Sequence, residues 1–317
     1  MSTVDLQASY TAADTTPPKL LLNDGVRKLL PVHVQWFPTN RCNLHCTHCS
    51  CSNRDNQLEM PIDQACSVIE SLASYGCKAV TITGGGEPTC HPQLSKMVQA
   101  FQQHGIKIGL VTNGLLLNTL DLWTLQSLTW CRISNNDERS MTSRYQQILA
   151  EVVSSAEEVD WAFSHVVSQE PNYEEIKRIV QFANDHRFTH VRLVADILNA
   201  GEIDLQPVRE YLVGIDQHVL YQPRNFPVPS RSCAIGYIKP VIAPDFKMYL
   251  CCGVQYALEE PSRDLPEALS MGDARDLDAV YGQTRKPFTV HCAHCYYEGY
   301  NNVLRPLANK IEHKEFL

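Results

Sequence analysis

Residues 41–52 read Arg-Cys-Asn-Leu-His-Cys-Thr-His-Cys-Ser-Cys-Ser, and they decide how the rest of the chain is interpreted. Cys42, Cys46 and Cys49 stand in the spacing C-x3-C-x2-C, which lets three thiolates converge on one face of a tight loop. This spacing favours a four-iron 4Fe-4S cluster. Three thiolates leave one iron without a protein ligand, and such an iron can bind a substrate or a cofactor.

A second stretch favours the cluster over a structural zinc loop. Residues 78–88 read Lys-Ala-Val-Thr-Ile-Thr-Gly-Gly-Gly-Glu-Pro, a short β-branched run that ends in three glycines and an acid. Glycines after a strand let the backbone approach a ligand closely, and Glu87 can accept a hydrogen bond from a ligand ammonium. A zinc loop, with Cys51, His45 or His48 as its fourth ligand, has no need of this turn.

Together the two stretches resemble the radical S-adenosylmethionine (SAM) enzymes. The three cysteines match the cluster motif of that family, and the turn matches its methionine-binding motif. Polar residues that end two later strands are similar to family positions near SAM. The resemblance therefore implies SAM contacts from Gly84, Gly85, Gly86, Glu87, Asn113 and Ser134.

Strand and helix patterns alternate six times along the first two thirds of the chain. Strands are expected at 32–37, 79–83, 106–111, 130–133, 161–167 and 190–197, with helices at 61–75, 92–104, 120–128, 145–155 and 173–186. This alternation predicts an α/β fold with a parallel sheet and outer helices, and the resemblance implies a partial (β/α)6 TIM-type barrel. Because chemistry in such barrels collects at the carboxyl ends of strands, His165 and Asp196 are predicted to hold the substrate.

The pattern changes after residue 200. We expect an N-terminal arm at 1–30, the barrel at 31–200, a linker at 201–232 with a helical stretch at 208–221, and a small C-terminal domain at 233–317. Residues 241–250 are predicted to form a hairpin with its turn at Pro244 and Asp245.

A second group of cysteines lies in the C-terminal domain. Four thiolates from a loop, a hairpin end and a CxxC can close around a second 4Fe-4S cluster. Zinc is the alternative, because His291 and His294 flank the CxxC. The resemblance extends to the short auxiliary-cluster domain (twitch/SPASM-like) of some radical SAM enzymes. It implies as ligands Cys233, Cys251, Cys292 and Cys295.

Cys252 is left over beside one of these ligands. Adjacent residues of an extended segment point in different directions, so Cys251 and Cys252 are not expected to bind one metal. Cys252 is predicted to be a thiol that faces the substrate and donates a hydrogen atom to it. A spare ligand and a buried thiol are the alternatives.

The resemblance implies an activity as well as cofactors. Reductive cleavage of SAM gives a 5′-deoxyadenosyl radical, which takes a hydrogen atom from a carbon of a small molecule or a peptide. Oxidation with help from the auxiliary cluster and epimerisation are the expected outcomes; peptide crosslinking and modification or rearrangement of a nucleoside or base are alternatives. An electron donor such as flavodoxin or ferredoxin is implied.

The composition of the chain limits the other classes of protein to which it could belong. The chain has 317 residues, 44% of them hydrophobic and 20% charged, as in an ordinary globular protein. A net charge of −8 argues against general nucleic-acid binding, and the longest apolar runs are too short for a membrane span. Thirteen cysteines in metal-like spacings indicate the reducing cytoplasm. A structural zinc-binding protein without enzymatic activity remains the alternative.

Overall fold

The main feature of the fold is a run of seven parallel strands, each paired with the next in chain order. The computed structural model describes residues 30–136, 140–199, 201–224, 229–255, 265–282, 287–293, 295 and 297–308. The parallel strands are β1 (His33–Trp36), β2 (Ala79–Ile82), β3 (Lys107–Thr112), β4 (Trp130–Asn136), β5 (Asp160–Val167), β6 (His190–Ala195) and β7 (Val219–Gln222).

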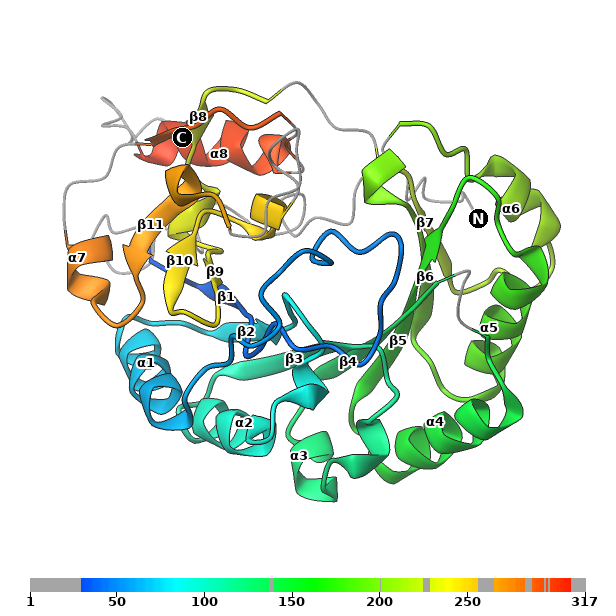
Figure 1. Cartoon of the computed structure of the whole chain (residues 1–317). Coiled ribbons are helices and arrows are strands. Elements are labelled where there is room, and N and C mark those ends of the chain that lie inside the picture. The colour runs from blue at the N-terminus through cyan, green and yellow to red at the C-terminus, as the bar shows by residue number, and fades with distance from the viewer. Residues whose placement is uncertain are drawn as a thin grey trace, which may run out of the picture.

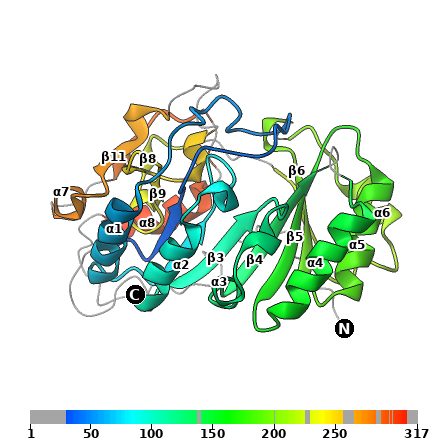
Figure 2. The same cartoon turned by 60° about the horizontal axis from the view of Figure 1, so that its bottom comes forward.

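Helices cover the outer face of this curved sheet (Figure 1). They are α1 (Ile62–Ser74), α2 (Leu94–Gln103), α3 (Leu122–Gln126), α4 (Ser143–Ser155), α5 (Tyr173–Asp185) and α6 (Gln206–Tyr211). Figure 2 shows the same layering, with the helices outside and the strands inside. The buried rings of Trp36 on β1 and Phe101 on α2 meet edge to face at 5.4 Å between their centroids, which fixes one helix against the sheet. The predicted α/β fold with a parallel sheet is confirmed.

The segment between the expected barrel and the C-terminal domain differs from the prediction. The helical stretch predicted at 208–221 ends early, because α6 stops at Tyr211 and Gly214 takes a positive φ of 94°. The chain then enters β7, which pairs in parallel with β6. The parallel sheet therefore continues beyond residue 200, through what was expected to be a linker.

The C-terminal part, expected at 233–317, extends the same sheet at the edge formed by β1. β9 (Val241–Ile242) pairs in parallel with β1, and β10 (Lys247–Tyr249) and β11 (Ser270–Asp273) follow it in antiparallel order. The predicted hairpin is present, and Phe246 takes a positive φ of 65° just before β10. The remaining elements are β8 (Ser232–Cys233), β12 (Phe288–Thr289), α7 (Leu277–Tyr281) and α8 (Glu298–Ala308).

The two parts thus share one sheet, and the C-terminal part lies beside β1 over the open side of the barrel (Figure 1). Within the described residues, none of the helices combines the length and apolar character that crossing a membrane requires. The expected N-terminal arm lies almost wholly outside the described residues.

Candidate active site

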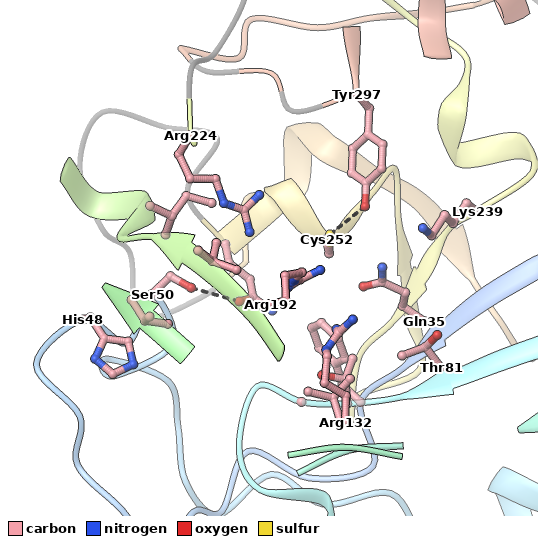
Figure 3. A pocket seen from close by; sticks show the side chains of 18 of the residues that line it. Gln35, His48, Ser50, Thr81, Arg132, Arg192, Arg224, Lys239, Cys252 and Tyr297 are labelled. Carbon is pink, nitrogen blue, oxygen red and sulfur yellow. Dashed lines mark hydrogen bonds between the residues drawn. The ribbon is translucent and has the colours of Figure 1, made fainter. Parts of the chain in front are cut away.

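A cavity of about 430 Å³ opens inside the barrel. Its walls come from β1 to β6, from the loop that carries the first three cysteines, and from the C-terminal part (Figure 3). The volume falls within the range of small-molecule sites. Because side chains alternate along a strand, every second residue of the central strands faces this space, as Arg132 on β4 and Arg192 on β6 do.

The cysteine loop is held at its start and along its length. Arg41 forms an ion pair with Glu59 on the returning chain. Inside the loop, the backbone N–H of Cys49 donates to the carbonyl of Cys46 at 3.2 Å, which makes a tight turn between two predicted ligands. Cys42 is exposed, whereas Cys46 and Cys49 are partly buried. None of the three thiols is fully buried, which is compatible with a cluster on this loop.

Cys51 forms hydrogen bonds both within the cysteine loop and to the C-terminal part. Its side-chain hydrogen bond lowers the pKa of Cys49 to about 6, so that the Cys49 thiolate, the form that binds iron, is favoured at neutral pH. Cys51 itself is buried, and its Sγ lies 2.7 Å from Oε1 of Gln255 in the C-terminal part. The side chain considered as a fourth zinc ligand thus ties the cysteine loop to the C-terminal part.

The glycine turn lies directly against the start of the cysteine loop. A Cβ on Gly86 would come within 2.2 Å of the carbonyl oxygen of Arg41, and one on Gly85 within 2.0 Å of Oδ1 of Asn40. The N–H groups of Gly86 and Glu87 donate to the carbonyls of Thr39 and Arg41 at 3.0 and 2.8 Å. Packing against the backbone of the cysteine loop therefore requires glycine at position 86, whereas the contact at Gly85 is with a side chain. The sequence had suggested that the glycines serve the close approach of a ligand, and Gly84 does line the cavity.

Glu87 joins the glycine turn to the end of β3. Its Oε1 accepts from N–H and Oγ1 of Thr89 at 3.0 and 2.6 Å and from Oγ1 of Thr112 at 2.6 Å. Its Oε2 accepts from the N–H of Asn113 at 2.7 Å. The carboxylate is buried and holds this corner together. Since Oε2 accepts one hydrogen bond among the described residues, it keeps acceptor capacity for the predicted ligand ammonium.

Asn113 directly follows β3, and Ser134 lies near the end of β4. The Nδ2 of Asn113 donates to Oδ1 of Asn43 at 2.6 Å, so that β3 also contacts the cysteine loop. Ser134 lies inside β4, which runs three residues further than predicted, and it pairs with Ser164 on β5. Alternation puts Ser134 on the same face of β4 as the cavity-lining Arg132. The SAM contacts assigned to both residues stay predictions.

His165 does not lie where the sequence predicted. It is fully buried, and its neighbour Val166 lines the cavity instead. Alternation turns His165 to the opposite, helix-covered face of β5, together with Phe163, which stacks on Phe188. The prediction that His165 holds substrate is therefore wrong. Asp196 does line the cavity, while its carboxylate accepts bonds from Leu198 N–H and Asn199 Nδ2 at 2.9 and 3.0 Å.

Cys252 lines the barrel cavity from the C-terminal part. Its Sγ lies 3.0 Å from the hydroxyl of Tyr297 (Figure 3). Lys239 lies over the ring of Tyr297, with 5.6 Å between Nζ and the ring centroid. Burial, followed by repulsion from Arg132, lowers the pKa of Lys239. Sequence reasoning missed Lys239 and Tyr297, which no motif marks.

The other cysteines of the C-terminal part surround a second, smaller cavity. Its lining includes all four predicted auxiliary ligands, whereas Cys252 is not among them. Burial raises the pKa of Cys233 to about 11, with further contributions from the nearby Cys295 and Cys292 thiols. The side chain of Asn301 on α8 accepts from the N–H groups of Ala234 and Ile235 at 2.7 and 3.0 Å and fixes the backbone after Cys233. His294 lies outside the described residues.

The thiol side chains of the two cysteine groups suit the two iron-sulfur clusters that the motifs imply. Among the described residues, no three His, Cys, Asp or Glu side chains gather tightly enough to hold one metal ion. The small cavity is lined by the four predicted auxiliary ligands, whereas the cysteine loop lines the barrel cavity through His48 and Ser50. At the end of β4, the buried Nδ2 of Asn135 has no hydrogen-bond partner within the described part of the chain, but alternation places it on the face opposite Ser134 and the cavity-lining Arg132.

Comparison with known proteins agrees with this geometry. Residues 36–134 match the radical SAM superfamily. The AdoMet-dependent heme synthase of Methanosarcina barkeri (strain Fusaro / DSM 804) is 28% identical over 170 residues, or 49% of this chain and 48% of that protein. This chain therefore spans about half of the length of that relative.

Two solved structures show the same fold at low sequence identity. SuiB of Streptococcus suis bound to the precursor peptide SuiA superposes with a TM-score of 0.59 at 16% identity, covering 80% of this chain and 66% of SuiB. The anSMEcpe structure with bound AdoMet and Kp18Cys peptide gives a TM-score of 0.54 at 15% identity, covering 90% of this chain and 85% of that one. The likeness extends through the C-terminal part.

Proposed function

We propose that this chain, which carries a radical SAM domain, cleaves SAM reductively and oxidises or epimerises a carbon centre of a small molecule or peptide. Two 4Fe-4S clusters would serve it, one on the cysteine loop and an auxiliary one in the C-terminal part. An electron donor such as flavodoxin or ferredoxin would reduce the enzyme in the cytoplasm, where free thiols persist.

Residues around the barrel cavity would hold the cofactors. Cys42, Cys46 and Cys49 would ligate the first cluster, and the glycine turn with Asn113 and Ser134 would bind SAM beside it. When bound, these groups supply a 5′-deoxyadenosyl radical that removes a hydrogen atom from the substrate. The protein would position the substrate between the barrel and the C-terminal part, both of which line the cavity.

One observation carries the proposal furthest: adjacent cysteines face different cavities. Cys251 lines the small cavity together with Cys233, Cys292 and Cys295, whereas Cys252 lines the barrel cavity. This arrangement supports a ligand role for Cys251 and a substrate-facing role for Cys252. A structural zinc site would give no reason for the second thiol to enter the barrel.

The groups beside Cys252 serve either outcome. In epimerisation, Sγ of Cys252 gives a hydrogen atom to the substrate carbon, and an electron from the donor with a proton through the Tyr297 hydroxyl restores the thiol. In oxidation, Lys239, whose lowered pKa increases its neutral fraction, would remove a proton from the substrate radical, and the auxiliary cluster would accept the electron. Peptide substrates are favoured by likeness to proteins that bind SuiA and the Kp18Cys peptide, and small molecules by the heme synthase.

The test combines iron content with the product of SAM cleavage. We expect about eight irons per wild-type chain after anaerobic reconstitution and about four in Cys233→Ala/Cys292→Ala. Wild type with dithionite and SAM should release 5′-deoxyadenosine, and Cys42→Ala should release none. About four irons in both proteins would remove the auxiliary cluster from the proposal. Release of S-adenosylhomocysteine, or a colourless zinc protein, would refute the proposed chemistry.

A further inference from the structure

One wall of the barrel cavity carries polar side chains from three separate segments. Gln35 on β1, Thr81 on β2 and Lys239 before β9 all line the cavity. Gln35 and Thr81 are register partners in the parallel pair of β1 and β2. The N–H of Gln35 donates to the carbonyl of Pro240 at 2.9 Å, which brings the backbone beside Lys239 against the same strand. Figure 3 shows the three side chains on one side of the cavity, near Cys252.

Thr81 is already engaged with a neutral partner. Its Oγ1 lies 2.8 Å from Nε2 of His33, which shares the cavity face of β1 with Gln35. Burial, followed by the charge of Lys239, lowers the pKa of His33 to about 3, so that the imidazole is neutral at physiological pH. Lys239 is therefore the cationic group of this wall.

Gln35 and Lys239 keep their polar groups available to a ligand. Within the described part of the chain, the side-chain amide of Gln35 forms no hydrogen bond, and Nζ of Lys239 forms neither a hydrogen bond nor an ion pair. The contact of Nζ is with the ring face of Tyr297, at 5.6 Å from the centroid. Both side chains are partly buried, so a ligand here would meet donors without displacing another protein partner.

The donors of this pair suit a carboxylate. An ammonium and an amide N–H can each donate to one of its two oxygens, and hydrogen bonds between charged partners are the stronger ones. One ammonium also matches one negative charge. Arg132 lies close enough to repel Lys239, and a position between like charges favours an anion over a neutral group.

We propose that Lys239 and Gln35 bind a carboxylate of the substrate and so hold the neighbouring carbon beside Cys252. Lys239 lies over the ring of Tyr297, whose hydroxyl is 3.0 Å from Sγ of Cys252, so the anchor and the thiol adjoin one another. A small acid and the carboxyl end of a peptide both offer this group, and the test separates them.

This assignment also distinguishes between the two proposed outcomes. A carboxylate beside Lys239 raises the pKa of its ammonium group and keeps it protonated. A protonated Lys239 cannot remove a proton from the substrate, so an anchored carboxylate favours epimerisation through Cys252 over oxidation. The inference rests on the proposed function in taking the barrel cavity as the substrate site.

The test measures binding and requires no turnover. The reconstituted full-length chain is saturated with SAM and titrated calorimetrically at constant ionic strength. L-lactate is compared with L-lactamide, and N-acetyl-alanyl-alanine with its C-terminal amide. Each pair differs in the charge of one group, and the two pairs separate a small acid from a peptide end. Release of 5′-deoxyadenosine is measured separately, so failure of this inference and failure of the proposed function are distinct results.

We expect at least one acid to bind and its amide not to. Gln35→Glu keeps the shape of the side chain but adds a negative charge, and it should weaken the binding of the acid at least about tenfold. The matched control, Gln99→Glu on the exposed face of α2, should change it by less than about twofold. Lys239→Met should also weaken it at least about tenfold, and Lys239→Arg should weaken it less.

Iron content and melting temperature check that each variant is folded, and Lys239→Met decides if Gln35→Glu does not fold. Binding of neither acid, equal binding of acid and amide, or unchanged affinity in the folded variants would overturn the proposal. SAM affinity should stay within about twofold of wild type. A loss of SAM affinity as large as the loss of acid affinity would assign the pair to the carboxylate of SAM and overturn the proposal as well.

Discussion

Glu87 offers the sharpest test of how the cysteine loop is positioned. Its buried carboxylate accepts four hydrogen bonds from Thr89, Thr112 and Asn113, and its backbone N–H donates to the loop. Glu87→Gln keeps the shape of the side chain but replaces one oxygen by a donor. If Glu87 acts only on a ligand, this variant should fold as well as wild type in the absence of SAM.

The expected loss of stability in Glu87→Gln follows from the four hydrogen bonds that the Glu87 carboxylate accepts. The least harmful orientation of the amide places its NH2 at the Oε2 position, facing the N–H of Asn113. One buried N–H then lacks an acceptor, which costs about 1 to 3 kcal/mol. The three bonds at Oε1 become neutral and weaker. We expect a total near 3 kcal/mol in the free energy of unfolding, and for a chain of 317 residues a melting temperature about 4 to 5 °C lower.

The assay is thermal and urea unfolding followed by circular dichroism under anaerobic conditions, without SAM. Glu70→Gln on the exposed face of α1 is the matched control and should unfold as wild type does. A Glu87→Gln protein that melts within about 1 °C of wild type would refute the reasoning, because four bonds at a buried carboxylate cannot be lost or weakened at so small a cost.

Three further predictions concern other parts of the site. Gly86→Ala should lower iron incorporation at the first site and destabilise the fold by at least about 2 kcal/mol, while Gly299→Ala, where a Cβ meets nothing within 4 Å, should not; iron analysis and urea unfolding decide. Asn301→Ala should reduce iron from about eight toward about four per chain without stopping SAM cleavage, unlike the exposed Asn302→Ala. For His33 the folded pKa of about 3 lies below the unfolded value, so stability should fall as pH drops from about 6.5 toward 3, and His33→Gln should flatten that slope in urea titrations.

The sequence predicted the parallel sheet because each strand and helix carries a clear local period. It failed after residue 205, where Val208, Leu212, Ile215 and Val219 keep a helical spacing although the helix has ended. Gly214 adopts a positive φ there, and the last of these residues begins β7. Apolar spacing alone cannot tell one continued helix from a helix, a turn and a strand.

The site was predictable where spacing in sequence equals closeness in space. The first cysteine motif is local. Backbone alternation, which predicted that Cys251 and Cys252 diverge, agrees with the two cavities that they line, although Cys252 begins the 3-10 turn Cys252–Gln255. The same alternation would have excluded His165, since a strand end offers two faces and only one meets the cavity. Tyr297 and Lys239 meet Cys252 only through the fold, so no local pattern marks them.

The shared sheet explains why the two cavities lie so close together. β9 pairs with β1, and the segment that follows β10 brings Cys251 to one cavity and Cys252 to the other across a single peptide bond. Tyr297, two residues after Cys295, lines both cavities. A change that moves the cysteines of the small cavity must therefore also move the Cys252 thiol and the Tyr297 hydroxyl that line the barrel cavity. Loss of the proposed auxiliary cluster should alter what happens to the substrate before it alters the proposed SAM cleavage, because the cysteine loop and glycine turn are anchored to each other and to β3.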